Sequence, residues 1–577
     1  MPSLSRPPKM APHGLTRCSQ LATRSYTPTR CFSIAKNIDA RKERVVILGS
    51  GWAGYGFART LDPAKYERVI ISPRSYFVFT PLLASTAVGT LEFRTILEPV
   101  RRLPGKIGFY QGWADDIDFN RKTIRVETNA AEEAASKTRV PAPFPPAPFP
   151  PPSETSGLEK EVSTPAQKPK GDVIDIPYDK LVIACGAYSQ TFNIEGVREH
   201  AHFLRDIGDA RRIRLRVLSL FEQCSYPRGS DHLSDADKRQ LLHFAIVGGG
   251  PTGIEFAAEL HDLIRDDLAP IYPDLMPLVS ITVYDVAPKV LPMFDQALAG
   301  YAMDTFARQN IHVKTEHHLQ RLRLADGELG RRHGALRIKI AEYGDEEVGA
   351  GLVVWSTGLM ANPLVAKLAS QELALDGANP YSTAPGSTTR HLLRDARTGG
   401  LLTDPYLRAR TATKGSDGNS NSTSTSTSDN PTTPQPGGGS GAGGVLEDVY
   451  VIGDCAVMEH DASLPKTAQV AAQQATYLAR RLNSIPAGRN GKDSVVRDAT
   501  GAEAGGKPFR FRNWGTLTYL GSWKAIHQSQ ADELKGWVAW VVWRGAYLTK
   551  SMSWRNKLLV PVYWVISWLF GRGISRF

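Results

Sequence analysis

Cysteine is scarce in this sequence of 577 residues and is never paired locally. The five cysteines are Cys18, Cys31, Cys185, Cys224 and Cys455, and none belongs to a C-x-x-C or C-x4-C motif. This spacing argues against a disulfide framework and against a zinc site, and we expect no metal. Cys185 and Cys455 stand isolated at the ends of two expected strands, which argues against a redox-active thiol pair.

Long apolar runs are absent as well. No stretch of roughly 18 apolar residues occurs, so we expect no bilayer-spanning helix and no path for pumped protons. The apolar content of 42% and the charged content of 22% fit a globular body with two or three cores. The net charge is +11 without any nucleic-acid-binding motif, which favours an anionic lipid surface over nucleic acid as a partner.

Acidic residues are missing from residues 1–38. That stretch carries Arg6, Lys9, Arg17, Arg24, Arg30 and Lys36 among many Ser, Thr and Ala. This composition is typical of a mitochondrial transit peptide, with a disordered basic tail as the alternative.

Two further segments cannot bury a core. Val140–Ser153 reads VPAPFPPAPFPPPS, which predicts extended polyproline inside an insert over residues 130–170. Residues 411–444 are rich in Ser, Thr, Asn and Gly and predict a second disordered insert. Both are interpreted as surface insertions, and an SH3-type docking site in the first is a less favoured alternative.

The remaining sequence alternates short β-rich runs with amphipathic helical stretches. The clearest runs are residues 178–186, 280–286, 351–358 and 448–454. Buried strands that alternate with helices predict doubly wound parallel sheets of the α/β class.

One pattern resembles a calcium-binding loop but does not fit it. Asp116, Asp118, Asn120 and Glu127 match ligand positions, yet Arg121 occupies the position that requires Gly. Residues 123–128 also predict a strand, so we interpret this stretch as a β-turn.

The pattern G-x-G-x-x-G occurs twice, each time between an apolar strand and a helix rich in small residues. The copies are GSGWAG in RVVILGSGWAGYGFARTL (44–61) and GGGPTG in FAIVGGGPTGIEFAAEL (244–260). The three glycines allow a tight turn, close approach of a pyrophosphate and close helix–strand packing, while the helix N-terminus offers free N–H groups. These glycines are Gly49, Gly51 and Gly54 in the first copy and Gly248, Gly250 and Gly253 in the second.

An acid at the end of the second strand normally binds the adenosine ribose. Asp285 fits this position in the second copy, displaced by an apparent insertion over residues 263–279. Its carboxylate would repel a 2′-phosphate, which favours NADH over NADPH. The equivalent strand of the first copy ends at Ser72, whose hydroxyl could still bond a ribose.

A third motif indicates which cofactor each of the two glycine-rich copies binds. VYVIGDCA places Asp454 beside Gly453 at a strand end, and flavin enzymes with two nucleotide domains carry such a motif near the end of the FAD fold. We therefore expect FAD at the first copy and NADH at the second, with the NADH domain inserted into the FAD domain. ACGA (184–187) and STG (356–358) are expected to lead between them.

Glu255 lies near the start of the helix after the second copy. It could face the nicotinamide and position it over the flavin. An acid favoured near a helix N-terminus by the dipole explains it equally well.

At this point the sequence resembles a known family. GSGWAGYGFARTL, SPRSYFVFTPLLASTAVGTLEFRTILEPVR, VGGGPTGIEFAAEL, and IGDCA followed by LPKTAQVAAQQATYLAR are similar to the type II (alternative, rotenone-insensitive) NADH:ubiquinone oxidoreductases of fungal and plant mitochondria. The resemblance covers about residues 44–130, 171–366 and 445–577, outside the two inserts.

The resemblance implies sites for both cofactors. The FAD site it implies comprises Gly49, Gly51, Trp52, Ala53, Gly54, Ser72, Arg74, Thr80, Pro81, Leu82, Ala184, Gly186, Gly453, Asp454, Ala468 and Gln469. The NADH site it implies comprises Gly248, Gly250, Pro251, Thr252, Gly253, Glu255, Asp285, Thr357 and Gly358.

The resemblance also implies a quinone site at the family's A-Q-x-x-x-Q motif. Gln469 and Gln473 are spaced i and i+4, so both amides lie on one helix face, where they could bond a quinone carbonyl beside the flavin. A solvent-exposed Gln-rich turn is the alternative. With Glu255, these two residues form the expected catalytic set.

The C-terminal seventy residues combine tryptophan with positive charge. Eight of the eleven tryptophans lie from Trp514 to Trp568, and no acid follows Glu533. Trp537, Trp540 and Tyr547 are expected to share one helical stripe. Residues 558–570 are apolar for roughly 20 Å of helix, and Pro561 is expected to shorten it. This pattern predicts amphipathic helices lying in an anionic membrane surface, and the resemblance also implies homodimerisation there.

These observations predict two Rossmann-like domains and a C-terminal membrane-anchoring region. The expected boundaries are 1–38 transit peptide, 39–240 and 371–485 FAD domain, 241–370 NADH domain and 505–577 membrane region. The resemblance implies non-pumping NADH oxidation by ubiquinone through FAD, as a peripheral enzyme of the mitochondrial inner membrane. The lack of an apolar stop segment after the transit peptide weakly favours its matrix face. The alternatives are a flavin reductase of another acceptor, such as sulfide:quinone or monodehydroascorbate type, and an apoptosis-inducing-factor-like flavoprotein.

Overall fold

A computed structural model describes residues 42–128, 172–226, 233–373, 389–413, 444–485, 507–529 and 532–574. They belong to one compact unit, Lys42–Phe577. The expected transit peptide, the proline-rich insert over 130–170 and residues 414–443 of the second insert lie outside the described residues.

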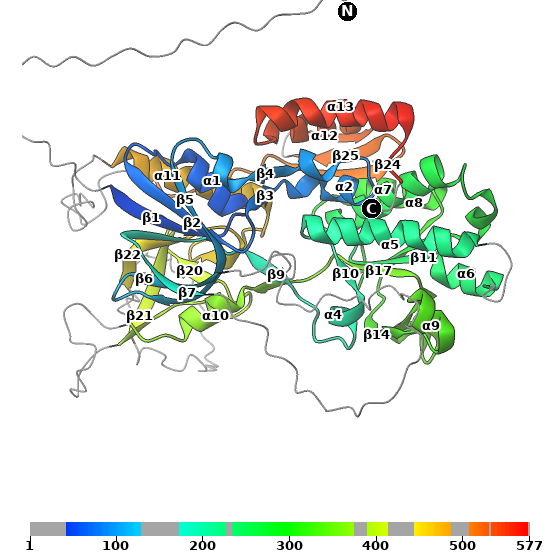
Figure 1. Ribbon diagram of the computed structural model, residues 1–577, viewed down its shortest axis with the longest axis horizontal. Helices are drawn as coiled ribbons and strands as arrows, with labels where there is room; N and C mark the ends of the chain where they lie inside the picture. Colours follow the sequence, from blue (N-terminus) through cyan, green and yellow to red (C-terminus); the bar gives the residue numbers. More distant parts are fainter. Residues whose placement is uncertain are drawn as a thin grey trace, which may run out of the picture. The chain divides into compact units, whose positions relative to one another are not determined.

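The first sheet contains eleven strands, and its centre is parallel as predicted (Figure 1). Along the sheet the order is β23-β20-β21-β22-β8-β1-β2-β5-β6-β7, with β19 paired to β21. The bounds are β1 Glu43–Leu48, β2 Tyr66–Ser72, β5 Ile107–Asp118, β6 Thr123–Thr128, β7 Val173–Pro177, β8 Lys180–Ile183, β19 Arg390–Leu392, β20 Leu401–Thr403, β21 Arg408–Thr413, β22 Gly444–Val451 and β23 Ala456–Met458. The strand predicted over 123–128 is confirmed.

Apolar runs form the central strands because both faces of the sheet are covered. Val45 and Ile47 pack into one hydrophobic core and Val46 and Leu48 into another. Helices α1 (Trp52–Thr60) and α11 (Ala468–Ser484) pack together and contribute to the first core. Helix α10 (Pro363–Ala369) packs against β5 and contributes to the second.

The second insert is shorter than the sequence predicted. Residues 411–413 belong to β21 and Gly444 begins β22, so both ends of the predicted disordered segment are strand. The ladder explains the difference: Thr411 pairs with Gly444 on one side and with Leu392 on the other, and its side chain is buried.

The second sheet contains five strands that are all parallel. Their order is β10-β17-β11-β12-β13, with bounds β10 His202–Phe203, β17 Leu352–Trp355, β11 His243–Val247, β12 Ser280–Tyr284 and β13 Ile311–Lys314. The helices of this part of the chain are α4 Val197–His200, α5 Ile207–Ser225, α6 Asp235–Leu241, α7 Pro251–Leu263, α8 Gln296–Arg308 and α9 Gly327–His333; of these, α4 packs against β14 (Leu319–Leu324) and α9 connects β14 to β15 (Leu336–Ile340). The stretch predicted as an insertion forms η4 (Ile264–Leu268) and η5 (Pro273–Leu278).

Two short antiparallel strands join the sheets. The chain leaves β8 through β9 (Ala187–Ser189) and returns through β18 (Leu359–Ala361), which pairs with β9. A separate antiparallel sheet contains β14 Leu319–Leu324, β15 Leu336–Ile340 and β16 Glu347–Ala350. The remaining small elements are β3 Tyr76–Val78, η1 Thr80–Leu82, α2 Leu83–Ala87, η2 Phe93–Thr95, β4 Leu97–Pro99, η3 Val100–Arg102, η6 Ala341–Tyr343 and η7 Gly453–Cys455.

The C-terminal region is a three-stranded antiparallel sheet followed by two helices (Figure 1). Its elements are β24 Thr516–Gly521, β25 Lys524–Gln528, β26 Glu533–Gly536, α12 Trp537–Lys550 and α13 Trp554–Phe570. Strand β24 packs directly against α7, so this region covers the helix that follows the second glycine turn. Within the described ranges, no helix combines the length and apolarity needed to cross a bilayer.

The expectation that Pro561 shortens the last helix is wrong. Helix α13 runs through Pro561, from Trp554 to Phe570, and packs through Val560 and Trp564 on either side of the proline. Trp537, Trp540 and Tyr547 all lie on α12, but their surroundings differ: the Tyr547 ring packs against Trp543 and Phe79, whereas Trp537 is 70% exposed.

Candidate active site

The first glycine turn lies at the carboxyl end of β1. Gly49 has φ +112°, and a Cβ there would lie 2.4 Å from the Ala184 carbonyl oxygen. A Cβ on Gly54 would lie 2.0 Å from the Gly49 carbonyl oxygen, so glycine is required where α1 meets β1. Nothing lies within 4 Å of a Cβ on Gly51, which leaves the start of α1 open to a ligand.

The end of β2 borders this turn, as the sequence predicted for the ribose position. Ser72 is buried there, and its Oγ lies 2.9 Å from Ser50 Oγ and accepts a hydrogen bond from Arg74 N. Arg74 forms a 2.8 Å ion pair with Asp206, an acid that the sequence did not single out. The Ser72 hydroxyl is therefore already hydrogen-bonded within the protein.

The loop before α2 closes the other side of the turn. Trp52 Nε1 donates to Thr80 Oγ1 at 2.9 Å, which joins the start of α1 to η1, the element that contains Pro81 and Leu82. Ala53, the next residue of α1, borders Gly453: a Cβ on Gly453 would lie 2.9 Å from the Ala53 methyl group. Residues expected at the FAD site from three separate segments thus come together.

Asp454 lies past the end of β22, next to the turn at Gly453. Gly453 N donates to the side chain of Gln474 at 2.7 Å, and this buried amide is a residue that the sequence analysis missed. Burial raises the pKa of the Asp454 carboxyl, although Arg205 and Lys466 oppose the rise. Nη1 of Arg205 is buried and has no hydrogen-bond partner among the described residues.

Cys185 and Cys455 are not isolated, which corrects the sequence analysis. Strands β8 and β22 are parallel neighbours with Ile183 opposite Val451, so both thiols follow adjacent strand ends. A hydrogen bond from the Cys185 thiol lowers the pKa of Cys455, and the same contact raises the pKa of Cys185. The sequence argument against a thiol pair therefore fails here, and the protein class must rest on other observations.

The second glycine turn repeats the geometry of the first at the end of β11. Gly248 has φ +116°, and a Cβ on Gly253 would lie 2.0 Å from the Gly248 carbonyl oxygen. A Cβ on Gly250 meets nothing within 4 Å, so this turn is also open. Pro251 and Thr252 begin α7 beside it, and the Thr357–Gly358 turn after β17 borders Gly248, with Thr357 Cβ 3.0 Å from where a Cβ would be.

Asp285 follows β12 and reaches this turn. Its Oδ2 accepts a hydrogen bond from Gly249 N, and its Oδ1 accepts one from Ala287 N at 2.7 Å. The carboxylate is thus held at the turn where the sequence predicted an acid for the ribose.

Glu255 is buried rather than exposed at the helix start. It lies beyond the first turn of α7 and is 8% exposed. Its Oε1 accepts hydrogen bonds from Tyr519 N at 3.2 Å and from Trp543 Nε1 at 3.3 Å. Burial raises the pKa of Glu255 to about 8 against these two hydrogen bonds. The helix-dipole explanation does not account for this placement, because the C-terminal region encloses the side chain.

Gln469 and Gln473 lie on one face of α11, and both contact the segment before β24. Gln473 Nε2 donates to Arg512 O at 2.8 Å, and Gln473 Oε1 accepts from Arg512 N at 3.0 Å. Gln469 Oε1 accepts from Trp514 N at 3.4 Å. Ala468 is the first residue of α11, and the side chain of Thr467 caps the helix. The two amides therefore attach the C-terminal region to the first domain.

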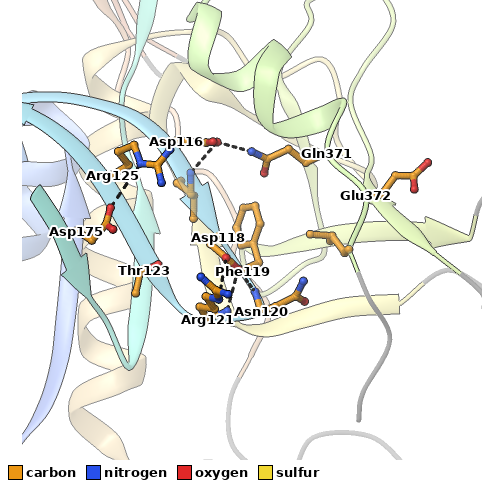
Figure 2. A pocket seen from close by; sticks show the side chains of 12 residues that line it. Asp116, Asp118, Phe119, Asn120, Arg121, Thr123, Arg125, Asp175, Gln371 and Glu372 are labelled. Atoms are coloured by element: carbon orange, nitrogen blue, oxygen red, sulfur yellow. Dashed lines mark hydrogen bonds and ion pairs between the residues drawn. The ribbon is translucent and has the colours of Figure 1, made fainter. Parts of the chain in front are cut away.

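A cavity lies at the pattern that resembles a calcium loop (Figure 2), and its lining contains no residue of either glycine turn. It measures about 350 Å³ and is lined mainly by β5, β6 and residues 371–373. Asp116 accepts a hydrogen bond from Gln371, and Arg125 lies 3.6 Å from Asp175. Because Asp116, which also lies 3.5 Å from Lys367, and the Arg125–Asp175 pair already have partners within the protein, we assign this cavity no role.

The fold and the two glycine turns define a two-domain dinucleotide-binding oxidoreductase. Residues 43–383 match the family described as pyridine nucleotide-disulphide oxidoreductase, and residues 513–573 match the NDH2 C-terminal domain. The structure of NDH2 from Plasmodium falciparum in complex with NADH superposes with a TM-score of 0.67 at 24% identity, covering 93% of this chain and 100% of that one.

Curated relatives place the chain in one family within this class of oxidoreductases. The external alternative NAD(P)H-ubiquinone oxidoreductase B3 of Arabidopsis thaliana mitochondria is 31% identical over 93% of this chain and 91% of its own length. The internal alternative NAD(P)H-ubiquinone oxidoreductase A1 of Solanum tuberosum mitochondria is 30% identical over 97% and 94%. A probable NADH dehydrogenase of Dictyostelium discoideum is 31% identical over 93% and 91%. The chain belongs to the type II NADH dehydrogenases, the alternative NAD(P)H–ubiquinone oxidoreductases.

The first glycine turn fits the FAD that this family implies. The open backbone at Gly51 suits a pyrophosphate, and the unpartnered Arg205 Nη1 beside Asp454 offers a donor. A small cavity of about 20 Å³ is lined by Gly453, Asp454 and Lys466 together with Val470 and Gln474 of α11.

Proposed function

We propose that this protein oxidises NADH and reduces ubiquinone through FAD, without pumping protons. The observation that carries the proposal is the pair of open glycine turns, at Gly51 and Gly250, in a chain of this family. Bound FAD supplies the redox chemistry, accepting a hydride from NADH and passing two electrons to the quinone.

Asp285 sets the choice of nicotinamide cofactor. Its carboxylate is fixed by Gly249 N and Ala287 N, so it cannot turn away from an adenosine ribose bound at this turn. It accepts hydrogen bonds from the ribose hydroxyls of NADH and repels the 2′-phosphate of NADPH. The ribose contact makes NADH the preferred donor.

Glu255 serves the reacting end of the site. Its carboxyl is enclosed by Tyr519 and Trp543 and holds a proton at neutral pH, because burial raises its pKa to about 8. A protonated carboxyl here orients the nicotinamide and holds a proton close to where quinone is reduced. Gln469 and Gln473 belong to the quinone side, where they fix the C-terminal region against α11.

Purified protein loaded with FAD tests this function. NADH oxidation is expected only after a short-chain ubiquinone is added, with one quinone reduced per NADH and flavin absorbance bleached first by NADH alone. Sulfide-dependent quinone reduction at a higher rate, or a long-lived reduced flavin that quinone does not reoxidise, would overturn the proposal. The sulfide result supports the sulfide:quinone alternative, and the second supports a binding or signalling flavoprotein.

The exposed face of α12 and α13 binds an anionic membrane surface. Its large apolar side chains include Trp537, Trp554, Trp568 and Phe570, which are 70%, 81%, 66% and 81% exposed. Lys557 lies over the Trp554 ring, a pairing of cation and aromatic group that suits a lipid headgroup boundary. Substitution of Trp554 and Phe570 by Ser leaves the packed face of α13 intact and should release the protein from phosphatidylglycerol vesicles.

We further propose that the same region forms a homodimer, and, as a separate point, that the enzyme lies at the matrix face of the inner membrane. Light scattering of the detergent-free protein should report twice the chain mass, and a monomer would refute the dimer.

Protease protection in mitoplasts compared with intact mitochondria tests which face of the inner membrane the enzyme occupies, since an enzyme on the matrix face stays protected in both. Trp113→Ser, in the first sheet, is the control for the vesicle assay. If the Trp554→Ser and Phe570→Ser variants stay on the vesicles as this control does, the proposed membrane-binding face is refuted.

A further inference from the structure

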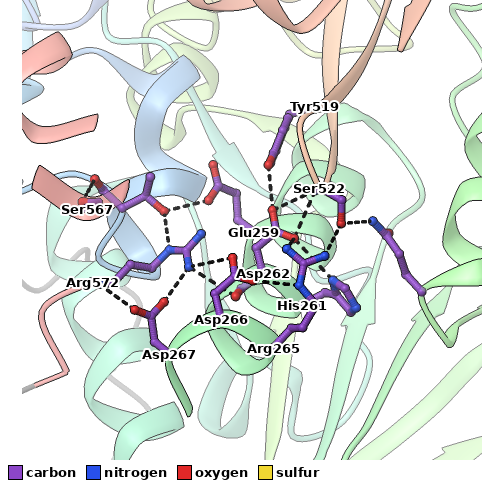
Figure 3. Close-up of polar contacts among 12 residues, drawn as sticks. Glu259, His261, Asp262, Arg265, Asp266, Asp267, Tyr519, Ser522, Ser567 and Arg572 are labelled. Atoms are coloured by element: carbon purple, nitrogen blue, oxygen red, sulfur yellow. Dashed lines mark hydrogen bonds and ion pairs between the residues drawn. The ribbon is translucent and has the colours of Figure 1, made fainter. Parts of the chain in front are cut away.

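Helix α7 carries three acidic side chains along one buried face, and two of them, Glu259 and Asp262, are labelled in Figure 3. Glu255, Glu259 and Asp262 are spaced i, i+4 and i+7, and they are 8%, 4% and 2% exposed. A buried carboxylate is costly unless it is paired or protonated, so each of these three groups needs a separate explanation.

Asp262 is held in its charged form. Tyr519 OH donates to its Oδ2 at 2.6 Å, Ser522 N donates to both of its oxygens at 3.1 Å, and Arg265 lies 3.6 Å away. Burial acts to raise the pKa of Asp262, but hydrogen bonds from His261 and Tyr519 outweigh it, and the pKa is lowered.

Glu259 lies in a different environment, because its two hydrogen bonds come from neutral hydroxyls. Ser85 Oγ donates to its Oε1 at 2.5 Å, and Thr90 Oγ1 donates to its Oε2 at 2.9 Å. Burial raises the pKa of Glu259 despite these hydrogen bonds and the charge of Arg572. The charged or titratable groups that face it are Glu255, Asp262, Tyr519, Arg544 and Arg572.

Arg572, near the C-terminus, orders this cluster and acts on Glu259 through its charge rather than through a direct hydrogen bond (Figure 3). Its Nη1 lies 2.6 Å from Asp267 and 3.5 Å from Asp266, and those acids hold the guanidinium in place. Its Nε donates to Thr90 Oγ1 at 3.0 Å, which leaves the Thr90 hydrogen pointing at Glu259. Glu259 is thereby a buried acid with hydroxyl partners, one helical turn from Glu255.

We propose that Glu259 is a second proton-holding group of the redox site and returns a proton to Glu255 during turnover. The proposal rests on the NADH:quinone activity proposed above. Reduction of one quinone to quinol takes up two electrons and two protons. The hydride from NADH supplies both electrons and one proton, so the second proton must come from water through the protein.

The proton balance assigns a step to each acid. Glu255 gives its proton to a quinone oxygen as the quinone is reduced to quinol, and Glu255 becomes a carboxylate. Glu259, about 6 Å away between Cβ atoms on the same helix face, passes its proton to Glu255 directly or through one water molecule. Glu259 then recovers a proton from solvent, and the net change is one proton taken from water for each quinol formed.

Glu259→Gln in the FAD-loaded enzyme tests the proposal. Anaerobic flavin reduction by NADH should stay within about twofold of the parent, because Glu259 does not contact the nicotinamide turn. The kcat for ubiquinone reduction should fall about tenfold at pH 7 and should recover partly when a small weak acid such as imidazolium is added. In the parent, the high-pH limb of the kcat profile should contain the ionisations of Glu255 and Glu259. In Glu259→Gln the ionisation of Glu259 should be missing.

Two comparison variants keep this test decisive. Glu98→Gln changes another buried acid, which accepts a hydrogen bond from Asn556 at 2.7 Å, and should leave the pH profile unchanged. Ser85→Ala keeps Glu259 but removes one hydrogen bond to its charged form, so the high-pH limb should move to higher pH even if Glu259→Gln does not fold.

An unchanged kcat and pH profile in Glu259→Gln, or an unmoved limb in Ser85→Ala, would overturn the role of Glu259. A parent enzyme that reduces no quinone would instead refute the proposed function itself. The two failures are therefore distinguishable in one set of measurements.

Discussion

Replacement of Glu255 by Gln should stabilise the folded protein, and the gain should grow as the pH rises. Burial raises the pKa of Glu255 from 4.5 to about 8, so between these values the folded state keeps a proton that the unfolded chain releases. Below about pH 4.5 both states are protonated and no penalty exists. As the pH rises to about 8, the folded state loses stability at about 1.4 kcal/mol per pH unit.

The size of this loss of stability follows from the distance between the two pKa values of Glu255, about 4.5 in the unfolded chain and about 8 in the folded protein. The total penalty approaches about 5 kcal/mol by pH 8, and the part between pH 5.5 and pH 8 is about 3 kcal/mol. Gln does not titrate, so the variant escapes this loss. It keeps an amide oxygen that can accept hydrogen bonds from Tyr519 N and Trp543 Nε1.

Thermal unfolding from pH 5.5 to 8.5, followed by the fluorescence of released flavin, measures the difference between variant and parent. The midpoint of Glu255→Gln should exceed that of the parent by an amount that rises with pH and becomes constant above about pH 8. Glu346→Gln, an exposed control, should give a constant offset. A Glu255→Gln difference that stays flat over this range would mean that the folded protein carries Glu255 ionised, and the burial argument would be refuted.

Three further predictions concern the nucleotide turns and the C-terminus. Asp285→Asn should raise the kcat/KM for NADPH relative to NADH at least tenfold, and an unchanged ratio in steady-state assays would remove Asp285 from the ribose site. Gly253→Ala should raise the KM for NADH at least tenfold while FAD absorbance stays stoichiometric, because the added Cβ would lie 2.0 Å from the Gly248 carbonyl oxygen; normal NADH affinity would refute this packing argument. Arg572→Met should lower the thermal midpoint by several degrees, because the Asp267 side chain, which is 8% exposed, loses its guanidinium partner and, among the described residues, keeps only the hydrogen bond from the backbone N of residue 572; an unchanged midpoint would show that the ion pair adds nothing.

Both glycine turns could be predicted from the sequence because their physics is local. A buried strand, a turn that needs positive φ at Gly49 and Gly248, and a helix that packs closely at Gly54 and Gly253 lie within a short stretch of chain. The same reasoning predicted the parallel sheets and the strand over 123–128. It failed at the ends of the second insert, because Thr411 becomes strand only through ladder partners on both sides.

Only the tertiary structure decided the environment of the buried acids and thiols. Glu255 is enclosed by Tyr519 and Trp543, which are contributed by the distant C-terminal region, and no pattern near Glu255 reveals them. The adjacency of Cys185 and Cys455 likewise follows from the parallel pairing of β8 with β22. Sequence determines what the backbone of a short segment can do, whereas burial and proton affinity depend on which remote segments exclude water from a side chain.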